Sequence, residues 1–351
     1  MAFPLRFGAV LPFALLLLGP ASAQVRYRIE TEEKQTVTGT LVYSASFPDL
    51  EAKEWIAFAA VAPELPGQRN PKTVFDFPTA EKAKDRSALA RGLLVASVPA
   101  KTDGLKTALS MKVRYTATLF SRHLAVAGDG RAVKVAPLTA EESQAALAGL
   151  GDIDFKDERF QKWLKAAGYL KRKAEGEIPF ARRVFLGLRA SHTYDYRPAM
   201  DRKASAVCDG GKSDCGGLSI LFVAAMRANG IPARALFGRW ATSAKPTDKL
   251  GEAAYYQWHV KAEFFAANVG WVPVDLAVSL LHDKSKDGLE HFGHDDGDFL
   301  TMHIDPNLEL DTVAFGRQSV HNLQNPPFWA SGAGKMDKRK DTESWTVEVK
   351  K

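Results

Sequence analysis

The chain has 351 residues, 46% of them hydrophobic and 25% charged, and its formal net charge is +6. This composition is typical of packed globular domains and excludes an intrinsically disordered protein. The net charge is small for the length, the basic residues do not gather in one stripe and no nucleic-acid motif accompanies them, so we expect no nucleic-acid partner. The length is greater than one compact core usually holds and predicts two domains.

The first 23 residues have the pattern of a secretory signal. Arg6 is the only early charge, residues 11–18 are apolar, and small residues at 21–23 form a cleavage site. Because the apolar stretch is too short to span a bilayer, we expect a signal peptide over 1–23 that is cleaved after Ala23. No later segment is apolar enough to cross a membrane. The sequence therefore predicts an exported protein, periplasmic or secreted, without a membrane span.

The next hundred or so residues have the pattern of β-structure. Apolar and polar residues alternate from 110 to 119, which is typical of a strand with one buried face. Shorter β-rich runs, separated by Pro and Gly, lie at 25–29, 37–43, 55–61 and 93–98. Together they predict a β-sandwich over 24–137, and this region contains no cluster of catalytic residue types.

Helix and strand patterns mix after Pro137. Thr139 and Glu142 form a capping box, and the pattern stays helical to about residue 189. A buried helix is expected at 218–230, followed by strands at 233–240, 255–264 and 270–275. We therefore predict a second domain over 138–325 and a charged tail over 326–351 with one strand at 345–349.

Three residues of the second domain form a candidate catalytic set. Cys215 precedes the buried helix, His259 lies within an expected strand, and Asp275 ends another. A helix N-terminus stabilises a thiolate, a His can act as the base, and a carboxylate can orient the imidazole. Each residue alone is more often structural, but their order and context predict a nucleophile, a base and an orienting acid. Gly216 and Gly217 are expected to leave the sulfur sterically open.

The only other cysteine is Cys208. Two cysteines are too few for a disulfide-stapled exported domain and indicate local chemistry instead. We expect Cys208 to be an inert loop residue. The alternative is a Cys208–Cys215 disulfide, which would block the nucleophile.

The same segments resemble a known family. The stretch DCGGLSILFVAAMRANGIPAR at 214–234 resembles the core motif of the transglutaminase-like superfamily, and 259–263 and 270–275 resemble its His strand and its G-W-x-x-x-D strand. The resemblance implies a papain-like core with a Cys-His-Asp triad at Cys215, His259 and Asp275. The expected fold class is then α+β, with a papain-like transglutaminase core preceded by an N-terminal β-sandwich.

The sequence departs from the family pattern at one position and leaves another open. The residue two after the His, which is often Trp in the family, is Lys261. The residue that completes the oxyanion hole is not placed by the resemblance. The candidates, each of which is more often a packing residue, are Tyr194, Tyr196, Gln257 and Trp258.

The loop at 291–298 brings carboxylates and imidazoles together in the sequence. It follows neither the spacing of a Ca²⁺ loop nor that of a zinc helix, so it predicts a solvent-exposed loop. We expect no metal and no cofactor.

The sequence therefore predicts an exported cysteine hydrolase, a peptidase or amidase, that forms a thioester with peptide or protein substrates, cell-wall peptides among them. An acyl transferase, in which an amine resolves the thioester, is the first alternative. A non-catalytic envelope binding or assembly protein is the second. Strand alternation places Lys261 on the same face as His259, where a cation would repel an incoming ammonium group. This consideration favours hydrolysis.

Overall fold

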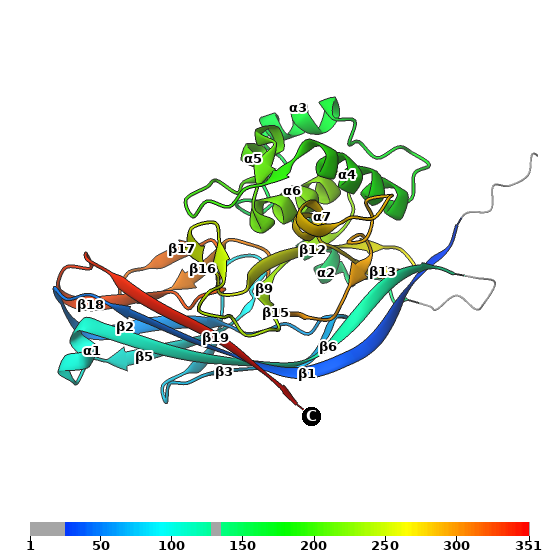
Figure 1. Cartoon of the computed structure of the whole chain (residues 1–351). Helices are drawn as coiled ribbons and strands as arrows, with labels where there is room; N and C mark the ends of the chain where they lie inside the picture. Colours follow the sequence, from blue (N-terminus) through cyan, green and yellow to red (C-terminus); the bar gives the residue numbers. More distant parts are fainter. Residues whose placement is uncertain (1–24, 128–134, 351) are drawn as a thin grey trace, which may run out of the picture.

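The computed structural model describes residues 25–127 and 135–350. The predicted signal peptide lies outside the described residues. Within these two ranges, no helix is both long enough and apolar enough to cross a membrane. Strands dominate the described chain, and most of its helices form a layer on one side (Figure 1).

Two antiparallel sheets form a β-sandwich. The larger sheet runs in the order β14 (His294–Asp295), β6 (Ala108–Val126), β1 (Tyr27–Ser46), β19 (Lys340–Lys350), with β3 (Gln68–Phe75) also paired to β6. The smaller sheet runs β18 (Phe328–Gly334), β2 (Leu50–Ala60), β5 (Gly92–Pro99), β4 (Glu81–Lys84), and the short helix α1 (Asp103–Thr107) contacts β2. In β6, buried Val113, Tyr115 and Ala117 alternate with less buried polar residues, so one face packs into the core.

The C-terminal segment completes this sandwich. β18 pairs with β2 and β19 pairs with β1, so each sheet contains a strand from the end of the chain. Trp345 of β19 is 1% exposed. Its indole fills the space over Gly39, where a Cβ would lie only 2.0 Å from the ring. The strand expected at 345–349 lies within β19.

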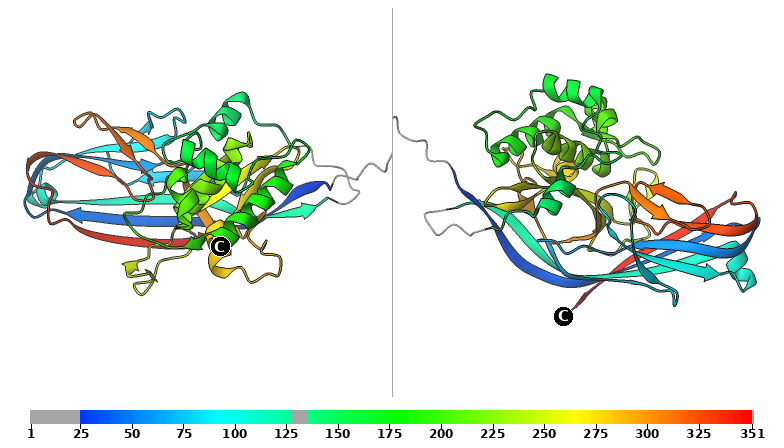
Figure 2. Two further views of the ribbon diagram at one scale, coloured as in Figure 1. Left: turned by 90° about the horizontal axis from the view of Figure 1, so that it is seen from above. Right: turned by 180° about the vertical axis from the view of Figure 1, so that it is seen from behind.

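A third antiparallel sheet lies between the sandwich and the helices (Figure 1). Its order is β13 (Gly270–Val274), β12 (Trp258–Ala266), β9 (Ala233–Trp240), β15 (Phe299–Ile304). The helices gather over one side of it, as Figure 2 shows from above. They are α3 (Glu158–Ala166), α4 (Glu177–Ser191), α5 (Ala204–Gly210), α6 (Cys215–Ala228) and α7 (Leu276–His282), whereas α2 (Ala140–Leu147) lies apart from this layer in Figure 1 and contacts β9.

Three two-stranded pairs complete the described structure. They are β7 (Thr193–Tyr194) with β8 (Lys212–Ser213), β10 (Lys249–Leu250) with β11 (Ala253–Ala254), and β16 (Leu308–Asp311) with β17 (Arg317–Val320). The first pair is parallel and brings the chain before α5 next to the chain before α6.

Helix α6 is the centre of the helical layer. Twelve of its 14 residues are buried, so it is apolar all round rather than on one stripe. It packs on β12, where the rings of Phe222 and Phe264 lie 6.2 Å apart and the Ser219 hydroxyl donates to the Val260 carbonyl at 3.0 Å. The α+β class and the β-rich N-terminal region predicted from the sequence are confirmed.

The third sheet is joined to the sandwich on its other side. Leu300 and Met302 of β15 are buried in the same apolar cluster as the sandwich strands. β14, from the loop that follows α7, pairs with β6. The sandwich and the sheet that carries His259 therefore share a core rather than meeting through a linker.

Candidate active site

Cys215 is the first residue of α6, and its backbone position is fixed by the N-cap. The Asp214 carboxylate accepts a hydrogen bond from the Gly217 amide at 3.1 Å. Arg202 in turn holds that carboxylate through Nε at 2.8 Å and Nη2 at 2.5 Å. Residue Cys215 as a whole is of intermediate exposure and stands at the start of an otherwise buried helix.

The glycines after Cys215 have a different role from the one expected. Gly217 packs so closely that a Cβ there would lie 2.0 Å from the Ser213 hydroxyl, and one at Gly216 would lie 3.3 Å from Arg202 Cδ. Both glycines are buried. They allow the first turn of α6 to approach β8 and Arg202.

The electrostatic environment of Cys215 also differs from expectation. Burial and the neighbouring Asp214 carboxylate raise the pKa of the thiol, and Asp275 adds to the rise. The Val260 backbone amide and the Arg202 guanidinium oppose it without reversing it. The helix N-terminus alone predicts a lowered thiol pKa, but the carboxylate that caps this helix lies beside the sulfur. The resting thiol is therefore neutral at pH 7.

His259 and Asp275 are in direct contact. His259 Nε2 donates to Asp275 Oδ2 at 2.7 Å, and both side chains are buried. Asp275 caps α7 through a 3.0 Å hydrogen bond from the Val278 amide to its other oxygen. Burial raises the pKa of Asp275, but His259, Lys261 and the Val278 amide outweigh it, so the pKa lies below its usual range. The carboxylate is thus ionised and leaves His259 Nδ1 for proton exchange.

Cys215 lies near the residues that surround His259 and Asp275. The Val260 amide that acts on the thiol belongs to the residue after His259, and Asp275 is close enough to raise the thiol pKa. Cys215 begins α6, His259 lies in β12 and Asp275 follows β13 as the N-cap of α7, and these elements are in contact with one another.

An aromatic wall surrounds His259. The Trp240 ring stacks on the imidazole with centroids 4.4 Å apart and planes inclined by 19°, and Phe299 meets it edge-on at 5.9 Å. Trp240 comes from β9 and Phe299 from β15, so neither lies near His259 in the sequence. The sequence analysis missed both, because a Trp at the end of an apolar strand has no local signal that distinguishes it from core.

The oxyanion-hole candidates fall into two groups. Tyr194 and Tyr196 lie close enough to Cys215 for its charge to contribute to their pKa values, which burial raises. Trp258 instead donates its indole N–H to Glu343 at 3.1 Å, and Gln257 donates to Asp248 at 3.4 Å.

Tyr255, which the sequence analysis did not single out, is also near the thiol. Burial and the charge of Cys215 raise its pKa. Its hydroxyl donates to the Trp258 carbonyl at 3.0 Å, which orients the ring at the start of β12.

Lys261 contacts the same aromatic wall. Its ammonium lies 4.7 Å from the centroid of Trp240 and 5.0 Å from that of Phe299. It is buried and paired with Asp295 at 3.3 Å and Asp298 at 3.8 Å. Burial lowers the pKa of Lys261, but the two carboxylates raise it by more, so the net effect is a raised pKa and the ammonium stays charged.

Asp295 corrects the expectation of a solvent-exposed loop at 291–298. It is 8% exposed and pairs with Arg122 of β6 at 2.9 Å as well as with Lys261. The loop is acidic because one of its carboxylates compensates buried cations, which a reading of the loop alone does not reveal.

Cys208 lies in helix α5 rather than in a loop. It is buried, its thiol donates to the Ser205 carbonyl at 3.3 Å, and burial raises its pKa to about 11. Both cysteines are free thiols in this structure.

Residues 165–276 match the family model of the transglutaminase-like superfamily. The chain contains a transglutaminase-like domain. The matched range includes Cys215, His259 and Asp275, and the family predicted from the sequence is confirmed. It extends from the end of α3 to the first residue of α7, and therefore contains α4, α5, α6 and three of the four strands of the third sheet.

The chain is also similar to individual proteins. It is 30% identical over 129 residues to an uncharacterized protein of Haemophilus influenzae, covering 33% of this chain and 34% of that protein. The matched segment thus spans about a third of the length of this relative.

The chain also has some similarity to two solved structures. A "Putative Cysteine Protease" from Cytophaga hutchinsonii is 11% identical with a TM-score of 0.49, covering 92% of this chain and 100% of that one. The periplasmic domain of TgpA from Pseudomonas aeruginosa is 14% identical with a TM-score of 0.33, covering 72% and 92%.

Proposed function

We propose that this protein is an exported cysteine hydrolase that cleaves amide bonds in peptides or proteins with Cys215 as nucleophile, His259 as base and Asp275 as the orienting acid. The observation that carries the proposal is the 2.7 Å bond between His259 Nε2 and Asp275 beside the N-terminus of α6. An ionised carboxylate on Nε2 keeps the lone pair on Nδ1, which is the arrangement a base needs.

The neutral resting thiol makes the base obligatory. His259 takes the thiol proton as Cys215 attacks the amide carbonyl, and the resulting imidazolium protonates the departing amine. A thioester at Cys215 remains. The first N–H groups of α6 and the Tyr194 hydroxyl are available to the oxyanion, since Tyr194 lies beside the thiol. Water, activated by His259, then releases the acid and regenerates the thiol.

The exposure of Cys215 supports water as the acceptor. Residue Cys215 as a whole is of intermediate exposure, so water can approach the end of α6 that carries it. A transferase needs a site that binds its amine and excludes water. The charge of Lys261 no longer argues against an amine, however, because Asp295 and Asp298 compensate it. The apolar rings of Trp240 and Phe299 beside His259 favour acyl transfer as the second candidate.

A partition experiment separates the two. The mature protein is incubated with glutamine- and alanine-containing peptide amides and with increasing methylamine, and the acid and the methylamide products are both quantified. We expect the acid product to dominate up to millimolar methylamine and to vanish in Cys215→Ala. A methylamide product that dominates while the acid falls in proportion would make the protein a transferase. Turnover of the amides by Cys215→Ala would remove the proposal altogether.

A further inference from the structure

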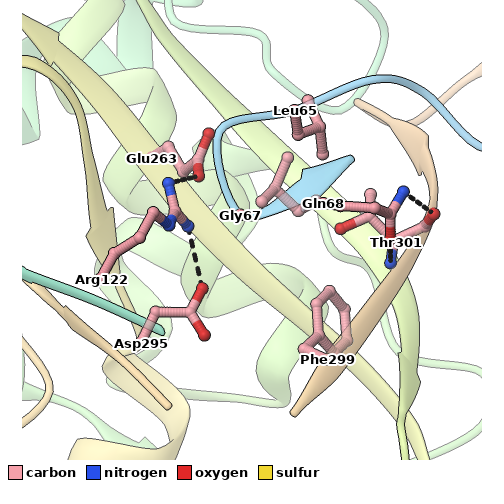
Figure 3. Close-up of a pocket in the computed structure, with 9 residues that line it drawn as sticks. Leu65, Gly67, Gln68, Arg122, Glu263, Asp295, Phe299 and Thr301 are labelled. Carbon is pink, nitrogen blue, oxygen red and sulfur yellow. Dashed lines mark hydrogen bonds and ion pairs between the residues drawn. The ribbon is translucent and has the colours of Figure 1, made fainter. Parts of the chain in front are cut away.

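A chain of buried charges runs from the sandwich to the back of His259. Arg122 of β6 pairs with Glu263 of β12 at 2.5 Å and with Asp295 at 2.9 Å. Figure 3 shows its guanidinium between these two carboxylates. Glu263 also pairs with Arg234 at 2.7 Å. The sandwich thus places a cation, 2% exposed, inside the transglutaminase-like domain.

Lys261 is the member of this chain that reaches the site. It pairs with Asp295 and contacts the Trp240 ring, and that ring stacks on His259. Lys261 is also close enough to Asp275 to lower its pKa. It is 8% exposed in its side chain and is therefore not a substrate-binding group.

The charges in this network balance. The cations Arg122, Arg234 and Lys261 meet the carboxylates of Glu263, Asp295 and Asp298. Five of the six side chains are at most 13% exposed, whereas Asp298 is 45% exposed. Removing one member leaves a net charge that water screens poorly.

We infer that Lys261 is a positioning residue for His259, held in place by the sandwich through Asp295 and Arg122. It presses Trp240 against the imidazole and sets the electrostatic potential in which His259 and Asp275 exchange protons. The inference rests on the proposed function, and it makes the sandwich a working part of the catalytic unit.

The groups around His259 give the sign of the effect. Its ring contacts Asp275, the N-cap of α7, and the rings of Trp240 of β9 and Phe299 of β15. Lys261 lies over both of these rings and pairs with Asp298, and Cys215 and Tyr255 are the other titratable groups near the site. Loss of the Lys261 cation favours the imidazolium, which cannot act as a base. Loss of the Asp298 carboxylate disfavours the imidazolium. Two substitutions therefore act in opposite directions on one measured quantity.

The test compares Lys261→Met with Asp298→Asn in the full mature chain. The acid limb of the kcat/KM profile should move to higher pH by about one unit in Lys261→Met and to lower pH in Asp298→Asn. KM should stay within twofold of the wild type. The double variant restores the balance, and Lys261→Arg keeps the charge, so both should lie near the wild-type profile.

A readout that needs no turnover accompanies the kinetics. The imidazole Cε1–H resonance of His259, assigned through His259→Gln, is titrated by NMR in each variant, and its midpoint should move in the same two directions. Unchanged midpoints in folded Lys261→Met and Asp298→Asn would overturn the inference and leave Lys261 a structural residue. If no amide is turned over but the midpoints move as stated, the proposed function fails and the electrostatic coupling stands. Asp298→Asn changes a half-exposed side chain, so it should fold even if Lys261→Met does not.

Discussion

At the scale of single residues, His259 is the most constrained side chain of the site. Asp275 holds Nε2, Trp240 covers one face of the ring, and Phe299 meets it edge-on. Cys215 is fixed in another way, by its place at the first turn of α6. Side chains orient His259, whereas the helix backbone positions Cys215. Because Nε2 is bound to Asp275, Nδ1 is the ring nitrogen of His259 whose lone pair can accept the thiol proton.

Replacing Asp275 with Asn should remove activity without unfolding the protein. An amide keeps the hydrogen bond to Val278, but it no longer favours the productive tautomer or stabilises the imidazolium. We expect kcat to fall on the order of 10³-fold with a change in melting temperature of a few degrees. Steady-state kinetics on the peptide amides and thermal melts measure both. A rate within tenfold of the wild type would remove Asp275 from the mechanism.

Alkylation tests the neutral resting thiol. Because burial raises the pKa of Cys215, thiolate forms at pH 7 only when His259 accepts the proton. Iodoacetamide should therefore label Cys215 about tenfold more slowly in His259→Ala than in the wild type. Cys208, with its pKa raised to about 11, should stay unlabelled in both and serves as an internal control in peptide mapping. Equal rates for Cys215 in the two proteins would argue against His259 as its base.

At the scale of elements, the sequence predicted best what is encoded locally. The capping box at Thr139, the buried helix after Cys215 and the strands around His259 each follow from periodicity and caps within some ten residues. The close packing of Gly217 against Ser213 was not visible, because it depends on the parallel pairing of β7 with β8. The contacts of Trp240 and Phe299 with His259 were also missed, because they depend on the pairing of β9 with β12 and β15.

Two glycine substitutions test the packing of α6. In Gly217→Ala the new Cβ meets the Ser213 hydroxyl at 2.0 Å, so the first turn of α6 must shift. We expect the free energy of unfolding to fall by about 1–3 kcal/mol. We also expect kcat to fall, since Cys215 moves with the turn. Gly210→Ala, at the end of α5 with nothing within 4 Å, is the control and should unfold within about 0.5 kcal/mol of the wild type. Urea melts of both compare them directly. Equal stabilities would refute the packing role.

At the scale of the whole molecule, the sandwich and the transglutaminase-like domain are interwoven. Strands β1 to β6 of the sandwich come first in the chain, the transglutaminase-like domain follows, and β18 and β19 then add the last strands of the sandwich. The sequence predicted a strand in the charged C-terminal tail but not its pairing with β1, because pairing across some 300 residues leaves no local signal. The buried ion pairs of Arg122 with Glu263 and Asp295 could not be predicted either, because these residues are far apart in the sequence.

The final strand should be essential for stability. Trp345→Ala removes an indole that is 1% exposed and leaves a cavity over Gly39, so the free energy of unfolding should fall by about 3–5 kcal/mol. Val349→Ala changes a 53% exposed side chain on the same strand and should cost less than about 0.5 kcal/mol. A Trp345→Ala protein as stable as Val349→Ala would mean that β19 does not close the sandwich.

The central claim is that amide cleavage passes through a thioester at Cys215. The direct measurement is acid quenching of the protein during turnover of the peptide amides, followed by intact-mass analysis and peptide mapping. We predict an acyl adduct on the peptide that contains Cys215, released by hydroxylamine and absent from Cys215→Ala. Asp275→Asn should accumulate it more slowly. An adduct on another residue, or turnover that continues in Cys215→Ala, would contradict the account.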